Sequence, residues 1–165
     1  MNPPASPRRR ILIIDDNPSI HQDFKKILAG GEITTSLDEL ETAIFGDTKS
    51  RGRGEYAFEV DSASQGEEGV QRVQDAAQEG RPYALAFVDI RMPPGIDGVE
   101  TTARLWQVDA DLQVVLCSAY ADYSWEEVAQ RLGINQRLLI LRKPFDNIEV
   151  RQMAHALAQK WDLSR

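Results

Sequence analysis

The sequence has 165 residues, of which 42% are hydrophobic, and its formal net charge is −7. This length is enough for one domain with its own core, and the acidic balance argues against nonspecific binding to nucleic acid. The single cysteine excludes an internal disulfide, and no apolar run approaches the roughly 18 residues of a membrane span. Composition therefore favours a soluble, cytoplasmic, acidic domain.

The first predicted strand follows a basic start that is rich in proline. Residues 1–9 hold three prolines and begin an arginine run, which predicts a disordered lead-in and not a signal peptide. Residues 11–14 form a short continuous apolar run, typical of a strand that is buried on both faces. Pro18 fits the first turn of the helix that follows. The apolar face of this helix consists of Ile20, Phe24, Ile27 and Leu28.

Residues 32–55 are predicted to be an insertion between the first helix and the second strand. Its first half carries one helical apolar stripe, and residues 46–54 are polar and rich in glycine, which indicates a loop. The stripe consists of Leu37, Leu40, Ile44 and Phe45. Three roles remain open for it: packing on the domain, docking a partner, or pairing with a second copy in a homodimer.

Strand and helix patterns then alternate to the end of the chain. Tyr56, Phe58 and Val60 alternate with other residues and predict a second strand that ends at Asp61. The later predicted elements are helix 65–79, strand 84–88, helix 99–108, strand 113–117, helix 125–132, strand 137–141 and helix 147–161. Five strands that alternate with five helices predict an α/β domain with a parallel sheet and helices on both faces. We expect this single domain to span residues 10–162.

Polar residues follow the predicted strands where chemistry is expected, at their carboxyl ends. In chain order these residues are Asp15, Asp16, Asp89, Ser118 and Lys143. Asp61 ends the second strand, but an outer strand would hold it away from the crevice. Three neighbouring carboxylates repel one another unless one is protonated or a cation lies among them. Oxygen ligands without His or Cys favour Mg²⁺ as that cation.

The same residue types suit phosphoryl transfer. A carboxylate in such a pocket can attack phosphorus, while Mg²⁺ and a lysine screen the phosphoryl oxygens and a serine hydroxyl binds one of them. Each residue also has an ordinary structural explanation. Asp15 could form an Asx turn or cap, and Asp89 could be a helix cap or turn residue. Ser118 could be a cap, and Lys143 part of a surface turn. Their joint position at one edge of one sheet favours the chemical interpretation.

Four motifs together resemble the receiver domain of response regulators, the CheY-like domain of bacterial two-component signal transduction. They are ILIIDDN at 11–17, FVDIRMP at 87–93, VVLCSA at 114–119 and KPF at 143–145. The resemblance covers about residues 10–160. It implies a flavodoxin-like, doubly wound, five-stranded parallel sheet with the strand order 2-1-3-4-5.

The resemblance also implies a role for each acidic residue. It identifies Asp89 as the phosphoacceptor, and both Asp16 and Asp89 as ligands of Mg²⁺. Asp15 would act on the metal directly or through water. The backbone carbonyl of Arg91 would complete the metal site.

Ser118 and Lys143 take the phosphoryl-binding roles that the resemblance implies. Ser118 would bind the phosphoryl group and move with it, and Lys143 would pair with its oxygens. The resemblance implies that the peptide bond between Lys143 and Pro144 is cis, as it is in the family. The family's switching aromatic ring, three residues before the lysine, is replaced by Ile140.

The implied function is a phosphorylation switch and not an enzyme, although the domain assists its own phosphoryl transfer and dephosphorylation. A histidine kinase or a phosphotransfer protein would supply the phosphoryl group. The phosphoprotein would then signal to an effector that is not visible in this chain. No nucleic-acid or membrane partner is expected.

Two alternatives come from other classes of protein. A phosphorylation-independent pseudo-receiver scaffold is compatible with Ile140 and with a loop after Asp89 that is one residue longer than usual. An aspartyl-phosphate hydrolase would need an Asp-x-Asp motif after the first strand, where this chain has adjacent aspartates. His21 and His155 lie in predicted helices without the acidic neighbour and bundle context of a phosphorelay donor.

Overall fold

The computed structural model describes residues 9–28, 58–118, 125–133, 137–143 and 145–164. One five-stranded sheet with strand order β2-β1-β3-β4-β5 forms its centre, and every neighbouring pair is parallel. The strands are β1 (Arg10–Ile14), β2 (Glu59–Ala63), β3 (Tyr83–Asp89), β4 (Gln113–Ser118) and β5 (Leu138–Arg142). The predicted doubly wound topology with the order 2-1-3-4-5 is confirmed.

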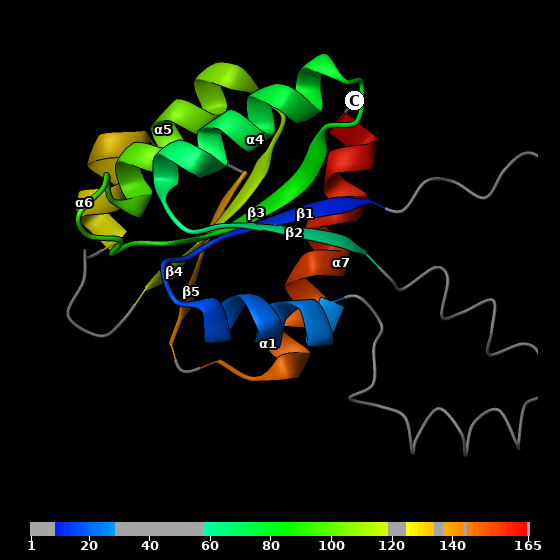
Figure 1. Ribbon diagram of the computed structural model, residues 1–165, viewed down its shortest axis with the longest axis horizontal. Helices are drawn as coiled ribbons and strands as arrows, with labels where there is room; N and C mark the ends of the chain where they lie inside the picture. Colours follow the sequence, from blue (N-terminus) through cyan, green and yellow to red (C-terminus); the bar gives the residue numbers. More distant parts are fainter. Residues whose placement is uncertain (1–8, 29–57, 119–124, 134–136, 144, 165) are drawn as a thin grey trace, which may run out of the picture.

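Helices cover both faces of this sheet (Figure 1). Their bounds are α1 (Pro18–Leu28), α4 (Gly66–Gln78), α5 (Gly98–Val108), α6 (Trp125–Leu132) and α7 (Asn147–Ser164). Figure 1 shows α1 and α7 on one face, and α4 and α5 on the other with α6 beside them. No helix within the described ranges has the length and apolar character that crossing a membrane requires.

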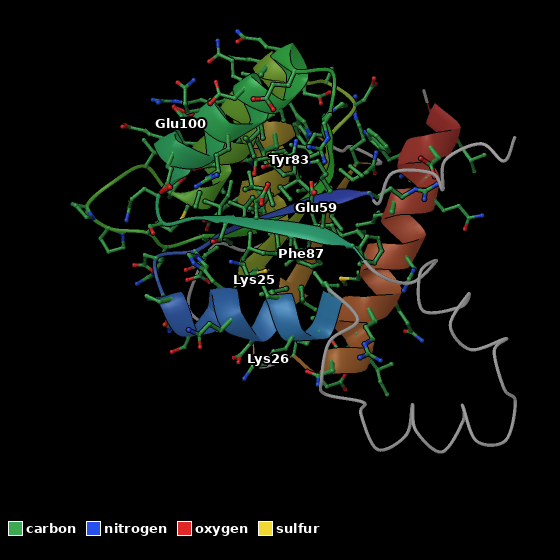
Figure 2. All side chains as sticks on the ribbon, turned by 45° about the vertical axis from the view of Figure 1, so that its right-hand side comes forward. Lys25, Lys26, Glu59, Tyr83, Phe87 and Glu100 are labelled. Carbon is green, nitrogen blue, oxygen red and sulfur yellow. The ribbon has the colours of Figure 1, made fainter. Side chains whose placement is uncertain are left out.

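Side-chain alternation along the strands divides the core into two layers. Ile11 and Ile13 of β1 belong to the cluster beneath α1 and α7, whereas Leu12 and Ile14 belong to the cluster beneath α4 and α5. All four are at most 1% exposed. Because successive residues of a strand point to opposite faces, a strand buried on both faces must be apolar throughout, as this one is. Figure 2 shows Phe87 on the α1 side of the sheet.

The second strand differs from its prediction. It begins at Glu59, after Phe58, and continues past Asp61 to Ala63. The predicted alternation placed this strand too early in the chain. The observed strand is largely polar, so its position is set by backbone pairing with β1, for example of Arg10 with Glu59. Tyr56 and the predicted insertion at 32–55 lie outside the described residues.

Arg9 also departs from the predicted boundaries, since it contacts the domain instead of belonging to a lead-in. Its carbonyl accepts a hydrogen bond from the Glu59 N–H at 3.0 Å, and its guanidinium pairs with Asp162 near the end of α7. The other residues of the predicted lead-in, 1–8, lie outside the part of the chain that the structure describes.

Candidate functional site

The carboxyl edge of the sheet brings three aspartates together. Asp15 and Asp16 follow β1 directly, and Asp89 is the last residue of β3, the neighbouring strand. Each offers a carboxylate oxygen within 4.8 Å of the other two. Asp15 is 3% exposed and Asp89 is 8% exposed, while Asp16 is open to solvent. The three carboxylates thus line a half-open site that is accessible on the Asp16 side.

Lys143 brings a positive charge into this group. It directly follows β5, and its backbone N–H donates to the Ser118 carbonyl at 2.8 Å. Its Nζ lies 3.3 Å from Oδ1 of Asp89 and 3.5 Å from Oδ2 of Asp15. We call Asp15, Asp16, Asp89 and Lys143 the carboxyl-edge cluster.

The electrostatics of the cluster are unbalanced. Burial and the neighbouring charge of Asp15 raise the pKa of Asp89 to about 6, although Lys143 acts in the opposite direction. Burial alone would lower the pKa of Lys143, but Asp15 and Asp89 outweigh it and raise that pKa. Three carboxylates against one ammonium leave excess negative charge in a partly buried site. Such an arrangement disfavours the charged form of Asp89.

The donor set fits a hard divalent cation. Within the described ranges, these aspartates are the one group of three or more His, Cys, Asp or Glu residues close enough to share an ion. Carboxylate oxygens without nitrogen or sulfur ligands suit Mg²⁺ or Ca²⁺. A site with one exposed side also suits Mg²⁺, because this ion usually keeps several waters.

Ser118 lies at the same edge of the sheet. It ends β4, is 6% exposed, and follows Cys117, which is the partner of Asp89 in the β3–β4 pairing. The Ile90 N–H donates to the Cys117 carbonyl at 3.2 Å and extends this pairing past Asp89. The structure therefore brings Ser118 and Lys143 to the edge that holds the three aspartates, as expected.

The turn after β1 explains how one aspartate can have two roles. Oδ1 of Asp15 accepts the Asn17 N–H at 2.9 Å, which closes an Asx turn. Oδ1 of Asn17 accepts the Ser19 N–H at 3.0 Å, at the start of α1. The structural explanation of Asp15 and its place in the cluster hold together, because each uses a different carboxylate oxygen.

The loop after Asp89 returns closely to the backbone of that residue. The Gly98 N–H donates to the Ile90 carbonyl at 2.7 Å, and a Cβ at Gly98 would lie 2.4 Å from the Asp89 carbonyl oxygen. Only glycine fits this approach. Asp97 then caps α5 by accepting the Glu100 N–H at 2.8 Å. The Asp97 cap was not predicted from the sequence, although Asp before Gly at a helix start is a recognisable capping signal.

Three further features bear on the sequence-based expectations: the exposure of Arg91, the peptide bonds that precede prolines, and the packing of Ile140. Arg91 is exposed. The peptide bond between Pro93 and Pro94 is cis. The expected cis bond after Lys143 involves Pro144, which is outside the described residues. Ile140 is half-buried and packs against the core cluster on the α4 and α5 face.

His21 contacts the site, which the sequence analysis did not predict. Its Nε2 lies 2.6 Å from the Asp15 carbonyl oxygen. No spacing rule marks this contact, because it depends on where α1 starts relative to the turn.

Asp61 lies away from the site, as expected, but it stands in the middle of β2 and not at its end. It accepts hydrogen bonds from the Tyr83 hydroxyl at 2.6 Å and from Nη2 of Arg10 at 2.9 Å. Arg10 and Tyr83 are the first residues of β1 and β3, so this contact belongs to the amino edge of the sheet. Figure 2 shows Tyr83 on the face opposite Phe87.

The chain belongs to the response regulator receiver domain family. A match to the family of that description covers residues 50–155, more than half of the chain. The fold and the acidic carboxyl edge agree with this assignment. The protein is therefore a receiver domain of two-component systems, a class of signalling modules.

Two curated bacterial proteins are similar in sequence. The C4-dicarboxylate transport transcriptional regulatory protein DctD of Pseudomonas aeruginosa is 29% identical over 86% of this chain and 23% of its own length. Sporulation initiation phosphotransferase F of Bacillus subtilis is 31% identical over 41% of this chain and 51% of its own length. The aligned segments thus span about a quarter and about half of the lengths of these relatives.

Solved structures share the fold at low sequence identity. A CheY-like receiver domain protein from Methanospirillum hungatei has a TM-score of 0.66 and 18% identity, with 96% of this chain and 99% of that chain covered. The receiver domain of an HD domain-containing protein from Pseudomonas fluorescens has a TM-score of 0.68 and 16% identity, with 99% and 96% covered. These neighbours support the receiver fold.

Proposed function

We propose that this receiver accepts a phosphoryl group on Asp89 from a phosphohistidine of a partner histidine kinase or phosphotransfer protein. The observation that carries the proposal is the convergence of three carboxylates within 4.8 Å, with Lys143 Nζ 3.3 Å from Asp89. Membership of the receiver family makes this the first function to test.

Each residue has a defined part in the proposed reaction. An Oδ atom of Asp89 attacks phosphorus, the bond from phosphorus to the histidine nitrogen breaks, and the imidazole takes the electron pair. Lys143 pairs with the phosphoryl oxygens, and the Ser118 hydroxyl binds one of them once the group is in place. In dephosphorylation, water attacks phosphorus, the bond from phosphorus to the Asp89 Oδ breaks, and inorganic phosphate leaves the free carboxylate behind.

We assign Mg²⁺ to the side chains of Asp15, Asp16 and Asp89 and to the backbone carbonyl of Arg91. When bound, the ion would offset the negative charge of the carboxylates and of the phosphoryl oxygens. Asp15 is fixed by its turn, whereas Asp16 faces solvent and leaves room for coordinated water. Direct and water-mediated contact of Asp15 with the ion are both compatible with this arrangement.

Apart from Arg9, which also contacts it, the proposed domain keeps the predicted span of residues 10–162 with an insertion at about 32–55, and the proposed location is the bacterial cytoplasm. Phosphorylation would bias a two-state arrangement near Ser118 and Lys143 and so signal to an effector. Ile140 in place of the usual aromatic ring implies that this coupling does not use an aromatic side chain at that position.

Incubation with acetyl phosphate and Mg²⁺, followed by intact mass spectrometry, tests the proposal. We expect one phosphoryl adduct that is absent without Mg²⁺ and absent in Asp89→Asn. A chain that forms no adduct and binds no beryllofluoride would contradict the proposal and favour the scaffold alternative. Steady release of phosphate from a simple phosphomonoester would instead favour a hydrolase.

A further inference from the structure

His21 links α1 to the turn that carries two of the three carboxylates. Its half-buried ring lies in the first turns of α1, and its Nε2 is 2.6 Å from the Asp15 carbonyl oxygen. A carbonyl oxygen can only accept, so the ring must donate its Nε2–H. This bond fixes the tautomer of the ring and connects the helix to the end of β1.

The bond completes the anchoring of Asp15. The Asp15 N–H donates to the Ala63 carbonyl at 3.1 Å, and Oδ1 accepts the Asn17 N–H at 2.9 Å. The carbonyl is the remaining backbone group, and His21 holds it. Oδ2 is thereby directed to the cluster, where it lies 3.5 Å from Lys143 Nζ.

The same bond acts on Asp16. The peptide unit between Asp15 and Asp16 is planar, so a restraint on its carbonyl also restrains the Cα position of Asp16. Asp16 is exposed and is repelled by two neighbouring carboxylates, a combination that would favour movement of the turn away from the site. A fixed peptide plane opposes this movement before any cation is present.

We infer that His21 is a positioning residue for the metal site, acting through the main chain of Asp15 to hold the carboxylates of Asp15 and Asp16 ready for Mg²⁺. The inference rests on the proposed function, because it requires these carboxylates to be the ligands. Preorganised ligands lose less freedom when the ion binds, so removal of His21 should weaken binding. Groups that orient metal ligands typically change affinity by about 10- to 100-fold when they are removed.

The test compares two substitutions at His21 with one at the other histidine. His21→Phe keeps a ring but removes the donor, and His21→Gln keeps an N–H donor at similar reach. His155→Phe makes the same change in α7, where the ring packs at a tilt against Phe58, with centroids 5.0 Å apart, near the amino edge of the sheet. Calorimetric titration with Mg²⁺ should show affinity about 10-fold lower for His21→Phe, near-parent affinity for His21→Gln, and no change for His155→Phe.

The outcomes separate this inference from the proposed function. If the parent binds no Mg²⁺, both the role of His21 and the proposed function are contradicted. If the parent binds Mg²⁺ and His21→Phe binds it equally well, only the role of His21 falls. A lower melting temperature without a change in Mg²⁺ affinity would mean that His21 has a purely structural role, and it would also overturn the inference.

A spectroscopic measurement covers the case in which His21→Phe does not fold. Long-range ¹H–¹⁵N spectra of the parent should show His21 as the Nε2–H tautomer, with a ring signal that shifts when Mg²⁺ is added. The shift should be absent in Asp16→Asn. A ring in the Nδ1–H tautomer, or one that does not respond to Mg²⁺, would contradict the proposed coupling.

Discussion

At the amino edge of the sheet, two arginines pair with two carboxylates in one cluster. In the carboxyl-edge cluster, there are three carboxylates and one lysine. The amino-edge cluster consists of Arg10, Glu59, Asp61, Arg81 and Tyr83. In it, Nε of Arg10 lies 2.7 Å and Nη2 of Arg81 lies 3.0 Å from Oε2 of Glu59. The Arg10 guanidinium also covers the Tyr83 ring, 4.4 Å from its centroid. Charges are matched at this edge and unmatched at the other.

One residue type behaves in opposite ways at the two edges. Burial alone would raise the pKa of Asp61, but hydrogen bonds from Tyr83 and Arg10 outweigh it and lower that pKa. At the carboxyl edge, burial and Asp15 raise the pKa of Asp89. Asp61 is matched by its partners and stabilises the fold, whereas Asp89 shares one lysine with Asp15 and is the carboxylate that we propose binds a cation and a phosphoryl group. Matched charges at the amino edge thus stabilise the fold, whereas the excess of carboxylates at the carboxyl edge lowers its stability.

The largest expected effect is the loss of the lysine of the carboxyl-edge cluster. Lys143→Ala removes the ammonium that lies 3.3 Å from Asp89. Loss of one preorganised donor to developing charge typically slows a reaction by about 100-fold or more. We therefore expect acetyl phosphate to phosphorylate this variant about 100-fold more slowly, as measured by intact mass over time.

Lys25→Ala is the control for this prediction. Lys25 is an exposed lysine of α1, as Figure 2 shows, and its substitution removes the same charge outside the cluster. The control should be phosphorylated at the parent rate. Equal rates for Lys143→Ala and the parent would contradict the role of Lys143.

The second largest effect is expected on stability, when the ion pairs of the amino-edge cluster are removed. Arg10→Met removes a guanidinium whose side chain is 14% exposed and leaves the carboxylates of Glu59 and Asp61 without it. Because these partners are partly exposed, we expect a loss of about 2 kcal/mol in the free energy of unfolding, below the cost of breaking a fully buried pair. Urea denaturation measures this loss.

Arg104→Met is the matched control for Arg10→Met. Arg104 pairs with Glu100 at 3.8 Å on the surface of α5, and both side chains are exposed. Such pairs contribute less than about 0.5 kcal/mol. If both variants lose equal stability, the amino-edge cluster is not a special stabilising network.

A smaller effect of opposite sign is expected from Asp89→Asn in Mg²⁺-free buffer. The folded-state pKa of about 6 lies above the reference value of 3.8, so the charged carboxylate costs stability above pH 6. The rise corresponds to at most about 3 kcal/mol, and solvent access at Asp16 reduces it to about 1–2 kcal/mol. The variant should be more stable than the parent at pH 8, and this advantage should disappear as the pH falls through 6 to 4.

Denaturation curves across this pH range measure the difference. The advantage of Asp89→Asn should also shrink when Mg²⁺ is added, because the ion stabilises only the parent site. A variant that is less stable than the parent at pH 8 without Mg²⁺ would show that the carboxyl edge is not electrostatically strained.

The sequence predicted the architecture well because its apolar runs are distinctive. Residues 11–14 and 84–88 are buried on both faces, and this burial requires continuous apolar runs that are visible in the sequence. The carboxylates after these runs could then be placed at one edge, since the carboxyl ends of parallel strands share an edge.

The sequence did not predict features that depend on contacts distant along the chain. β2 is largely polar, so its bounds follow from backbone pairing with β1 and from its contacts with Arg10, Arg81 and Tyr83. The contact of His21 with Asp15 depends on the geometry of the turn between strand and helix. Neither feature leaves a periodic pattern.

The most direct test of the account is a side-chain carboxyl titration by ¹³C NMR, with and without Mg²⁺. Without Mg²⁺, Asp89 should titrate near pH 6 and Asp61 below 3.8. Saturating Mg²⁺ should lower the pKa of Asp89, because a metal binds the deprotonated carboxylate, and should leave Asp61 unchanged. Similar pKa values for the two aspartates, or an Asp89 titration that Mg²⁺ does not affect, would contradict the assignment of opposite roles to the two edges.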